Sequence, residues 1–441
     1  MADRKGDVAI SQRTLLKRKN SEMVKVRPFK GLRPPTQIVE KVSCLPYDVM
    51  NSEEAARMAG GNEESLLNIT RAEICCPKGT DIHSETVYAK AKENFEKAQR
   101  KGWLRQDATP CYYIYELTME GRTQTGIVGA ASCDDYKNGL IKKHELTRPD
   151  KEDDRMTLTR KLKANIEPVF LAYKAVPEIS EMVNEAKKSA AEYDFTSDDG
   201  IRHRMWVLSA PEQVGKLKSL FETKVGATYV ADGHHRTAAA ARIGEEFAKQ
   251  NPNHTGRESY NYFMAVIFPD SELHIMDYNR VVKDLNGLSH KEFLDALGKV
   301  MDVEQEVADE LRPRKLHEFS MYMGGERFRL TAKARTYDDA DPIKVLDASI
   351  LTDQVLRPIL GIEDLRRSQR IDFVGGIRGL GALKAIVDRG DAEVAFALFP
   401  VSMKQLTDIA DTGNIMPPKT TWFEPKLRSG LFVKKVDGDA E

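Results

Sequence analysis

The sequence predicts a mixed α/β fold, and three observations lead to this class. A strand pattern at 227–231 is followed by a helix pattern that opens at His234 and by a second strand pattern at 262–268. Alternating apolar residues at 112–119 and small residues at 124–132 flank Glu120-Gly121, as expected for a hairpin. Hydrophobic residues make up 41% of the chain, yet no apolar run approaches the roughly eighteen residues of a membrane span.

Charge and cysteine content narrow the class of protein. The 441 residues carry 67 Lys and Arg against 68 Asp and Glu, so a general nucleic-acid coat or an anionic membrane surface is not favoured as a partner. Five cysteines are too few, and odd in number, for a disulfide framework. They predict reduced thiols and a cytoplasmic location. Composition leaves the oligomeric state open.

The remaining elements follow from local signals in chain order. Residues 1–22 are basic and lack an apolar signal core, so they predict a disordered tail. Asn51 or Ser52 is a helix N-cap candidate, and Gly60-Gly61 ends that helix. Apolar residues spaced three or four apart predict an amphipathic helix over 86–105. Further patterns predict strands at 168–173, 205–208, 327–330 and 395–399 and helices at 178–193, 211–222 and from about 382.

The first candidate site is the loop between the strand at 227–231 and the helix after it. Unpaired N–H groups at a helix N-terminus attract anions, and Gly233 lets a phosphate approach the backbone. Arg236 offers a planar fork for phosphate oxygens, His235 can donate a proton, and Asp232 can hold Mg²⁺ or accept a proton. In the alternative interpretation Asp232 is an ordinary N-cap and the His and Arg side chains are solvated.

Three further segments could carry chemistry. His144-Glu145 places a carboxylate beside a histidine, with Arg155 shortly after, which could activate a hydroxyl group and bind a charged substrate. Lys419 and Lys426 flank TTWFE and could reach a phosphate. The glycine-rich stretch 375–381 could approach a ligand. The alternatives are a solvated charged face, surface lysines and a packing turn, respectively. No P-loop, protein-kinase or nucleophile-elbow motif is present.

Several motifs together resemble known families. VADGHHRTAAA is similar to the nucleotide-binding box of the ParB/sulfiredoxin superfamily. VRPFKGLRP, LPYDV, HELT with KEDDR, DYNRVV, FVGG and MPPKTTWFEPK occur in the order of the family called domain of unknown function 1015, which contains or lies near free-serine kinases. The resemblance covers about Val24 to Val433. It implies a ParB/sulfiredoxin-like nucleotide-binding core with inserted and C-terminal α/β elements.

The resemblance also implies domains. We expect a disordered tail at 1–22, a core at 23–290 with an insertion at about 85–200, and a C-terminal α/β domain at 291–441 packed on the core. Sulfiredoxin-like enzymes carry a Cys where this chain has His234, so sulfinic acid reduction is not expected. The chromosome-partitioning members use a basic DNA-binding surface that this composition does not favour.

The activity implied by the resemblance is phosphoryl transfer from ATP or ADP to free L-serine, giving O-phospho-L-serine for cysteine synthesis. The alternatives are a non-catalytic nucleotide-binding regulator and a kinase of another small hydroxylated acceptor. The predicted roles are catalysis by Glu145, Asp232 and His235, phosphate binding by Gly233, His234, His235 and Arg236, substrate binding by His144, Thr147, Arg155 and Lys419, and Mg²⁺ binding by Asp232.

Overall fold

The computed structural model describes residues 23–307 and 312–438, so the predicted tail at 1–22 lies outside the described residues. The chain forms two compact units. Of the described residues, the first unit consists of 23–142, 147–273 and 425–438, and the second of 143–146, 274–307 and 312–424. These bounds differ from the predicted 23–290 and 291–441. The C-terminal segment belongs to the first unit because β21 (Lys434–Lys435) pairs with β7 (Ala164–Asn165).

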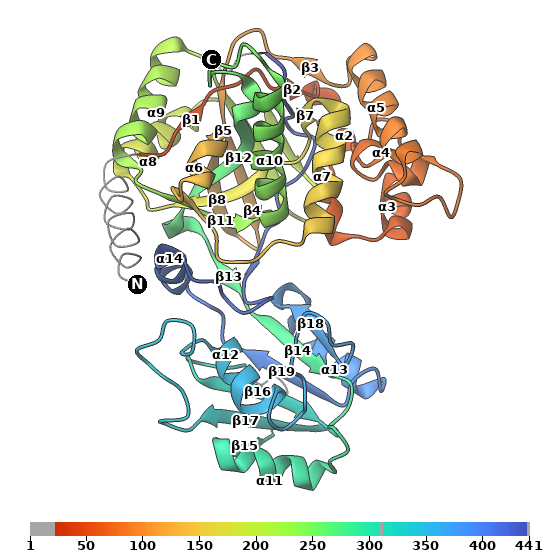
Figure 1. Cartoon of the computed structure of the whole chain (residues 1–441), viewed down its shortest axis with the longest axis vertical. Helices are drawn as coiled ribbons and strands as arrows, with labels where there is room; N and C mark the ends of the chain where they lie inside the picture. Colours follow the sequence, from red (N-terminus) through yellow and green to blue (C-terminus); the bar gives the residue numbers. More distant parts are fainter. Residues whose placement is uncertain (1–22, 308–311, 439–441) are drawn as a thin grey trace, which may run out of the picture. The chain divides into compact units, whose positions relative to one another are not determined.

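The first unit is built on a large mixed sheet (Figure 1). β6 pairs with β11, and β8 with β12, in parallel, while the other neighbours are antiparallel. The predicted hairpin is confirmed, with Glu120 and Gly121 at positive φ in its turn. The strand order is β6 (Ile141–Lys142), β11 (Thr228–Asp232), β8 (Val169–Tyr173), β12 (Tyr262–Pro269), β5 (Arg122–Ser132), β4 (Tyr112–Met119), β10 (Arg202–Leu208) and β9 (Tyr193–Thr196), with β1 (Val26–Arg27) also on β5.

Two long helices lie side by side in this unit (Figure 1). They are α7 (Pro149–Leu162) and α10 (His234–Gln250), and Met156 of α7 packs with Ala239 and Ile243 of α10. The alanine-rich run predicted after Gly233 is therefore the buried face of a helix. The small side chains let α10 approach its neighbours closely.

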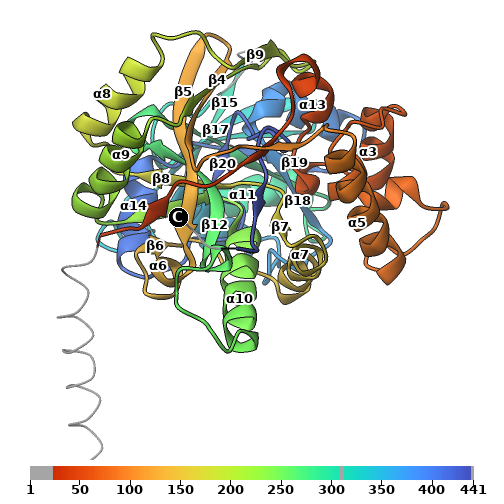
Figure 2. The same ribbon diagram turned by 90° about the horizontal axis from the view of Figure 1, so that it is seen from above.

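Another pair, α8 (Pro177–Ala186) and α9 (Pro211–Lys224), packs together elsewhere in the unit (Figure 2). The ring of Phe221 lies 5.9 Å from that of Tyr173. The predicted helix at 178–193 is too long, because α8 ends at Ala186 and Tyr193 is buried in β9. The charged residues Glu185, Lys187 and Lys188 give no periodicity that would mark the end of the helix in the sequence.

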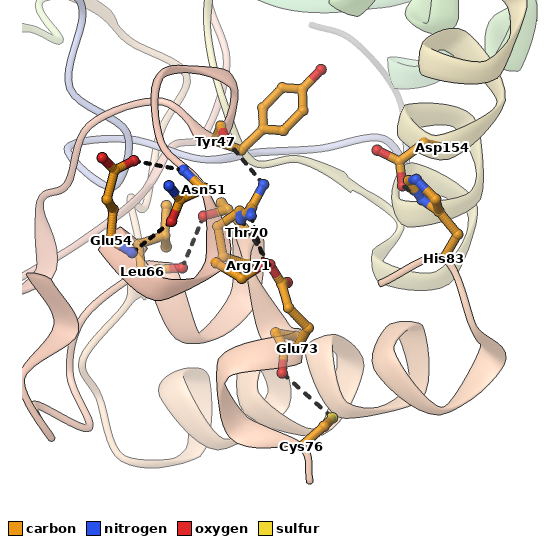
Figure 3. Close-up of polar contacts among 12 residues, drawn as sticks. Tyr47, Asn51, Glu54, Leu66, Thr70, Arg71, Glu73, Cys76, His83 and Asp154 are labelled. Atoms are coloured by element: carbon orange, nitrogen blue, oxygen red, sulfur yellow. Dashed lines mark hydrogen bonds and ion pairs between the residues drawn. The ribbon is translucent and has the colours of Figure 1, made fainter. Parts of the chain in front are cut away.

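A small helical segment completes the first unit. Its helices are α2 (Val39–Val42), α3 (Ser52–Ala59), α4 (Leu67–Thr70) and α5 (Glu85–Arg100), with α6 (Cys133–Lys137) after β5 and β2 (Leu32–Arg33) paired with β3 (Arg105–Gln106). The predicted cap is confirmed, since the Asn51 side chain accepts from Glu54 N and the Glu54 carboxylate accepts from Asn51 N (Figure 3). Gly60 ends α3 in the left-handed region.

The second unit holds an antiparallel six-stranded sheet (Figure 1). Its order is β15 (Met301–Glu306), β17 (Glu326–Ala332), β16 (Glu318–Met323), β19 (Val394–Leu398), β14 (Tyr278–Val282) and β18 (Ile371–Gly375). Successive residues of a strand face opposite sides, so Val281 packs towards α13 (Gly379–Asp388) and Val282 towards α11 (His290–Val300) and α12 (Asp347–Leu351). The unit also contains α14 (Met403–Asp411) and β13 (Ile275–Met276) paired with β20 (Trp422–Phe423).

The fold class is thus mixed α/β, as predicted. All five cysteines are free thiols, which confirms the prediction from their number. Among the described residues, no helix combines the length and apolar character needed to span a bilayer.

Candidate functional site

The predicted anion loop is a tight junction between β11 and α10. Gly233 is the N-cap of α10 with φ of +92°, and no side chain caps the helix. The Asp232 Oδ1 atom instead accepts the Gly233 N–H at 2.9 Å. A Cβ atom on residue 233 would lie 3.1 Å from Arg236 Nε. The loop therefore needs glycine both for its backbone conformation and for the close approach of Arg236, and Asp232 is not an ordinary N-cap.

Arg236 is the most buried cation of this loop, with 8% of its side chain exposed. Its guanidinium donates to the Pro168 carbonyl and forms ion pairs with Asp48 at 3.6 Å and Asp232 at 3.9 Å. Burial alone would lower the pKa of Arg236, but Asp48 and Asp232 reverse that effect and raise it. Arg236 Nε has no hydrogen-bond partner in the described part of the chain.

Asp232 faces cations of its own unit. Lys426 Nζ donates to Asp232 Oδ2 at 3.2 Å. Arg236 Nη2 lies 3.9 Å from the same oxygen. Burial would raise the pKa of Asp232, but Lys426 and then Arg236 together hold it below its ordinary value. Mg²⁺ binds oxygen ligands, whereas these contacts bring two positive charges to the carboxylate. The described residues also include no group of three or more His, Cys, Asp or Glu placed to hold a metal. These contacts do not fit a resident metal at Asp232.

A second buried acid, Glu167, stands beside the loop at the start of the strand region of β8. Its Oε1 accepts Tyr47 N at 2.9 Å, and Arg155 Nη1 lies 3.5 Å from its Oε2. Burial raises the pKa of Glu167 despite the opposing effect of Arg155 and Arg236. Glu167, Arg155 and Arg236 line one small cavity. Two arginines and a buried carboxylic acid thus meet on one side of the predicted phosphate loop.

Arg155, predicted to bind substrate, is held inside the protein. Its guanidinium donates to Asp154 Oδ2 through Nε at 2.8 Å and Nη2 at 2.6 Å, and its Cζ lies 3.7 Å from the centre of the Tyr47 ring. The side chain is 11% exposed. These contacts suit a residue that positions Asp154 and Glu167.

The other predicted residues of the first unit are His234 and His235, which begin α10, and Thr147, which precedes α7. His234 is buried, and its electrostatic interaction with Asp232 lowers the pKa of that carboxyl further. His235 is half-buried in the first turn of α10, and Thr147 is half-buried in the segment before α7. The first unit thus brings together Asp232, Gly233, His234 and Arg236, and it links Arg155 to them through Glu167.

The remaining predicted residues belong to the second unit. His144 and Glu145 lie in the four-residue segment 143–146. His144 is buried, its Nε2 lies 3.1 Å from Thr421 Oγ1, and its carbonyl accepts Met416 N at 2.9 Å. The HE and KTT motifs, 277 residues apart, therefore meet in this unit. Glu145 is half-buried beside them.

Aromatic rings pack beside the HE and KTT motifs of the second unit. The Tyr278 ring lies 5.0 Å from that of Trp422 and 6.1 Å from that of Phe373. Lys419 is exposed, with Nζ 5.7 Å from the centre of the Tyr278 ring. A Cβ atom on Gly375 would come within 2.8 Å of the Trp422 ring. The contacts of Gly375 match the packing alternative for the glycine-rich stretch.

Arg280, in the DYNR motif, is fully buried beside these rings. Its Nη1 donates to the Tyr278 carbonyl, and its Cζ lies 5.1 Å from the centre of the Phe373 ring. Nε and Nη2 have no hydrogen-bond partner in the described residues. Burial lowers the pKa of Arg280 to about 10.

The sequence predicts no site role for three residues of this cluster, Tyr47, Asp48 and Glu167. Lys426, a candidate phosphate contact from its place beside TTWFE, lies instead on Asp232 of the loop. Tyr47 and Asp48 belong to the LPYDV motif, which enters the sequence analysis only through the resemblance. Glu167 carried a signal of its own, because an acidic residue next to a predicted buried strand requires a partner.

The family follows from comparison with known proteins. The model of the family described as protein of unknown function (DUF1015) matches residues 26–349, well over half of the chain. The chain belongs to the DUF1015 family. The predicted membership is confirmed. No curated protein matches this DUF1015 chain.

Solved structures similar to this DUF1015 protein are distant. They include a Glu-to-Ala variant of free serine kinase in complex with AMP, with 13% identity, TM-score 0.36, and coverage of 71% of this chain and 91% of that chain. A conserved hypothetical protein from Pyrococcus furiosus has 14% identity, TM-score 0.35, and coverage of 70% and 95%. C-terminally truncated SbnI from Staphylococcus aureus has 11% identity, TM-score 0.37, and coverage of 70% and 87%.

Proposed function

We propose that this protein is a small-molecule kinase that transfers a phosphoryl group from ATP or ADP to a hydroxyl group, with free L-serine as the first acceptor to test. The observation that supports it is Arg236. This guanidinium is held over a glycine N-cap by two carboxylates and keeps a buried Nε without a partner among the described residues. A phosphate oxygen at the N-terminus of α10 would supply that partner.

The cluster suits nucleotide phosphates for a second reason. Lys426 and Arg236 are fixed by Asp232, so their positive charges are in place before a ligand arrives. Phosphoryl transfer has a loose transition state, and most of its catalysis comes from positioning and charge neutralisation. Mg²⁺ bound with a nucleotide would add charge neutralisation; we assign it no ligand in this chain.

In the proposed reaction, the acceptor hydroxyl oxygen forms a bond to the terminal phosphorus while the bond from that phosphorus to the bridging oxygen breaks. ATP leaves as ADP, or ADP leaves as AMP. The hydroxyl proton passes to a base, and we propose Glu145 for that role because a carboxylate beside His144 can accept it.

The test is incubation of the purified protein with Mg²⁺, L-serine and either ATP or ADP, followed by detection of O-phospho-L-serine by mass spectrometry. Arg236→Lys should weaken nucleotide binding, because an ammonium group cannot reproduce the fork held by Asp48 and Asp232. Glu145→Gln should leave nucleotide binding intact and lower turnover. Full turnover by Glu145→Gln would exclude Glu145 as the base.

A panel of amino acids and small alcohols separates the remaining alternatives. Phosphorylation of another hydroxyl compound in place of serine would retain the kinase and change the acceptor. Nucleotide binding that depends on Arg236, with no product from any acceptor, would identify a nucleotide-binding regulator.

A further inference from the structure

A second polar cavity of the first unit, the N-terminal pocket, lies among residues of the α4–α5 segment and α7. Figure 3 labels Arg71, Glu73, His83 and Asp154 of its wall. It is partly open to solvent, and its volume is about 40 Å³, enough for a group of a few atoms. Its polar walls include Arg71, Glu73, His83, Tyr88, Lys151 and Asp154. None of these six residues has a part in the proposed transfer reaction.

The two acids of the pocket are each neutralised by one arginine. Arg71 Nε lies 2.9 Å from Glu73 Oε1, and the pair is almost fully buried. Arg71 also donates to the Tyr47 carbonyl and to Ser52 Oγ, so its guanidinium is committed to the protein (Figure 3). Asp154 receives two hydrogen bonds from Arg155. These pairs cancel within the wall and leave no net charge for a ligand.

Two basic side chains of the wall, Lys151 and His83, are not needed to neutralise these acids. Lys151 is half-buried and has no ion pair in the described part of the chain. It precedes Asp154 by three residues on α7, so both lie on the same face of the helix. His83 is the second: its side chain is 48% exposed and its Nδ1 lies 3.1 Å from Asp154 Oδ1 (Figure 3).

Asp154 fixes the orientation of His83. Burial would raise the pKa of Asp154, but Arg155 and the Tyr88 hydroxyl hold it below its ordinary value, so the carboxylate stays charged. Tyr88 donates to Oδ1 at 2.7 Å, on the same oxygen that faces His83. With Nδ1 directed at Asp154, the imidazole presents Nε2 away from the carboxylate.

We propose that the N-terminal pocket binds a small oxyanion, a carboxylate or a phosphate monoester, through Lys151 and His83. Because both acids of the wall are paired with arginines, the positive charge of Lys151 is available to a ligand. Lys151 also lies in the first turn of the 14-residue helix α7, whose N-terminal dipole favours an anion. The site does not depend on the proposed kinase activity. Arg155 lines both this pocket and the cavity with Glu167 and Arg236, so the two sites share one wall residue.

The test uses inorganic phosphate and acetate as probes, titrated separately into the full chain in a low-salt buffer that contains no other oxyanion. Binding is followed by NMR through the His83 imidazole signals, which are assigned by their loss in His83→Gln, and by calorimetry. We expect at least one probe to shift these signals saturably. Lys151→Gln should weaken that binding by about tenfold, the loss of one charge-assisted contact.

Lys161→Gln is the matched control, because Lys161 lies on the same helix, pairs with Glu85 and does not line the pocket. It should leave the affinity within about twofold. Response to phosphate alone identifies a phosphate monoester site, and response to acetate alone identifies a carboxylate site. Saturable binding that Lys151→Gln leaves unchanged, or no saturable shift of His83 with either probe, would overturn the proposal. If Lys151→Gln does not fold, loss of calorimetric binding in His83→Gln decides in its place.

Discussion

Two buried arginines, Arg236 in the first unit and Arg280 in the second, differ in what surrounds their charge. Arg236 pairs with two carboxylates, and these raise its pKa above the ordinary value. Arg280 contacts a backbone carbonyl and a phenylalanine ring, and burial lowers its pKa to about 10. Burial alone therefore does not identify a functional cation. Paired carboxylates that hold the cation in place before a ligand binds are the better sign, and Arg236 of the first unit has two of them.

The largest difference should appear when each arginine is replaced by methionine. Arg236→Met removes the partner of Asp48, one of the two cations of Asp232 and the donor to the Pro168 carbonyl, so the free energy of unfolding should fall by about 3 kcal/mol. Urea denaturation monitored by circular dichroism measures this change. Arg242→Met is the control on the same helix: Arg242 is half-exposed, pairs with Glu152 and Asp153, and should cost about 1 kcal/mol or less. Equal losses in the two variants would contradict the role given to burial.

The second prediction concerns pH. The folded-state pKa of Asp232 lies below its ordinary value. Its ion pairs therefore stabilise the folded protein fully above the unfolded-state pKa of about 3.9. This stabilisation disappears as the pH falls through the folded-state pKa. Asp232→Asn should therefore lower the melting temperature most near neutral pH and progressively less below pH of about 4. Thermal melts of both proteins across this range measure the convergence. A constant difference at all pH values would show that the lost contacts of Asp232 are not electrostatic.

The third prediction isolates Lys426. Lys426→Met removes one of the two cations of Asp232, while Arg236 remains. The loss should be smaller than for Arg236→Met, about 1–3 kcal/mol, because Asp232 keeps its contact with Arg236 and with the Gly233 N–H. A double-mutant cycle with Asp232→Asn measures the coupling between the two side chains. Additive effects of the two substitutions would mean that the ion pair contributes nothing.

Local signals predicted much of the fold. The capping box at Asn51, the hairpin at Glu120-Gly121 and the start of α10 each depend on residues within one or two turns of chain. The helix at 178–193 was overextended because a charged run carries no periodicity to mark its end. The boundary between the units could not be predicted, since it depends on β14 pairing with β18 and β19 about a hundred residues later.

In the candidate site, too, local contacts could be predicted from the sequence and long-range contacts could not. Asp232 and Arg236 are four residues apart, so their proximity could be read from helical spacing. Lys426 reaches Asp232 across 194 residues, and Asp48 reaches Arg236 from the other end of the chain. Neither contact has a local signature. The contacts of Arg155 with Asp154 also differ from its predicted role as a substrate ligand, because the sequence shows two adjacent charges without showing that both are buried.

The smallest effect should come from Arg280→Met. Within 23–307 and 312–438 no carboxylate pairs with Arg280, so removing this buried cation leaves no charge behind, and an apolar side chain of similar length suits the neighbouring Phe373 ring. The free energy of unfolding should change by about 1 kcal/mol or less, or increase. Urea denaturation at neutral pH measures it, and Arg280→Lys, which keeps a buried charge, should be less stable than Arg280→Met. A loss as large as that of Arg236→Met would mean that the charge of Arg280 is compensated in the folded protein, and the contrast between the two units would not hold.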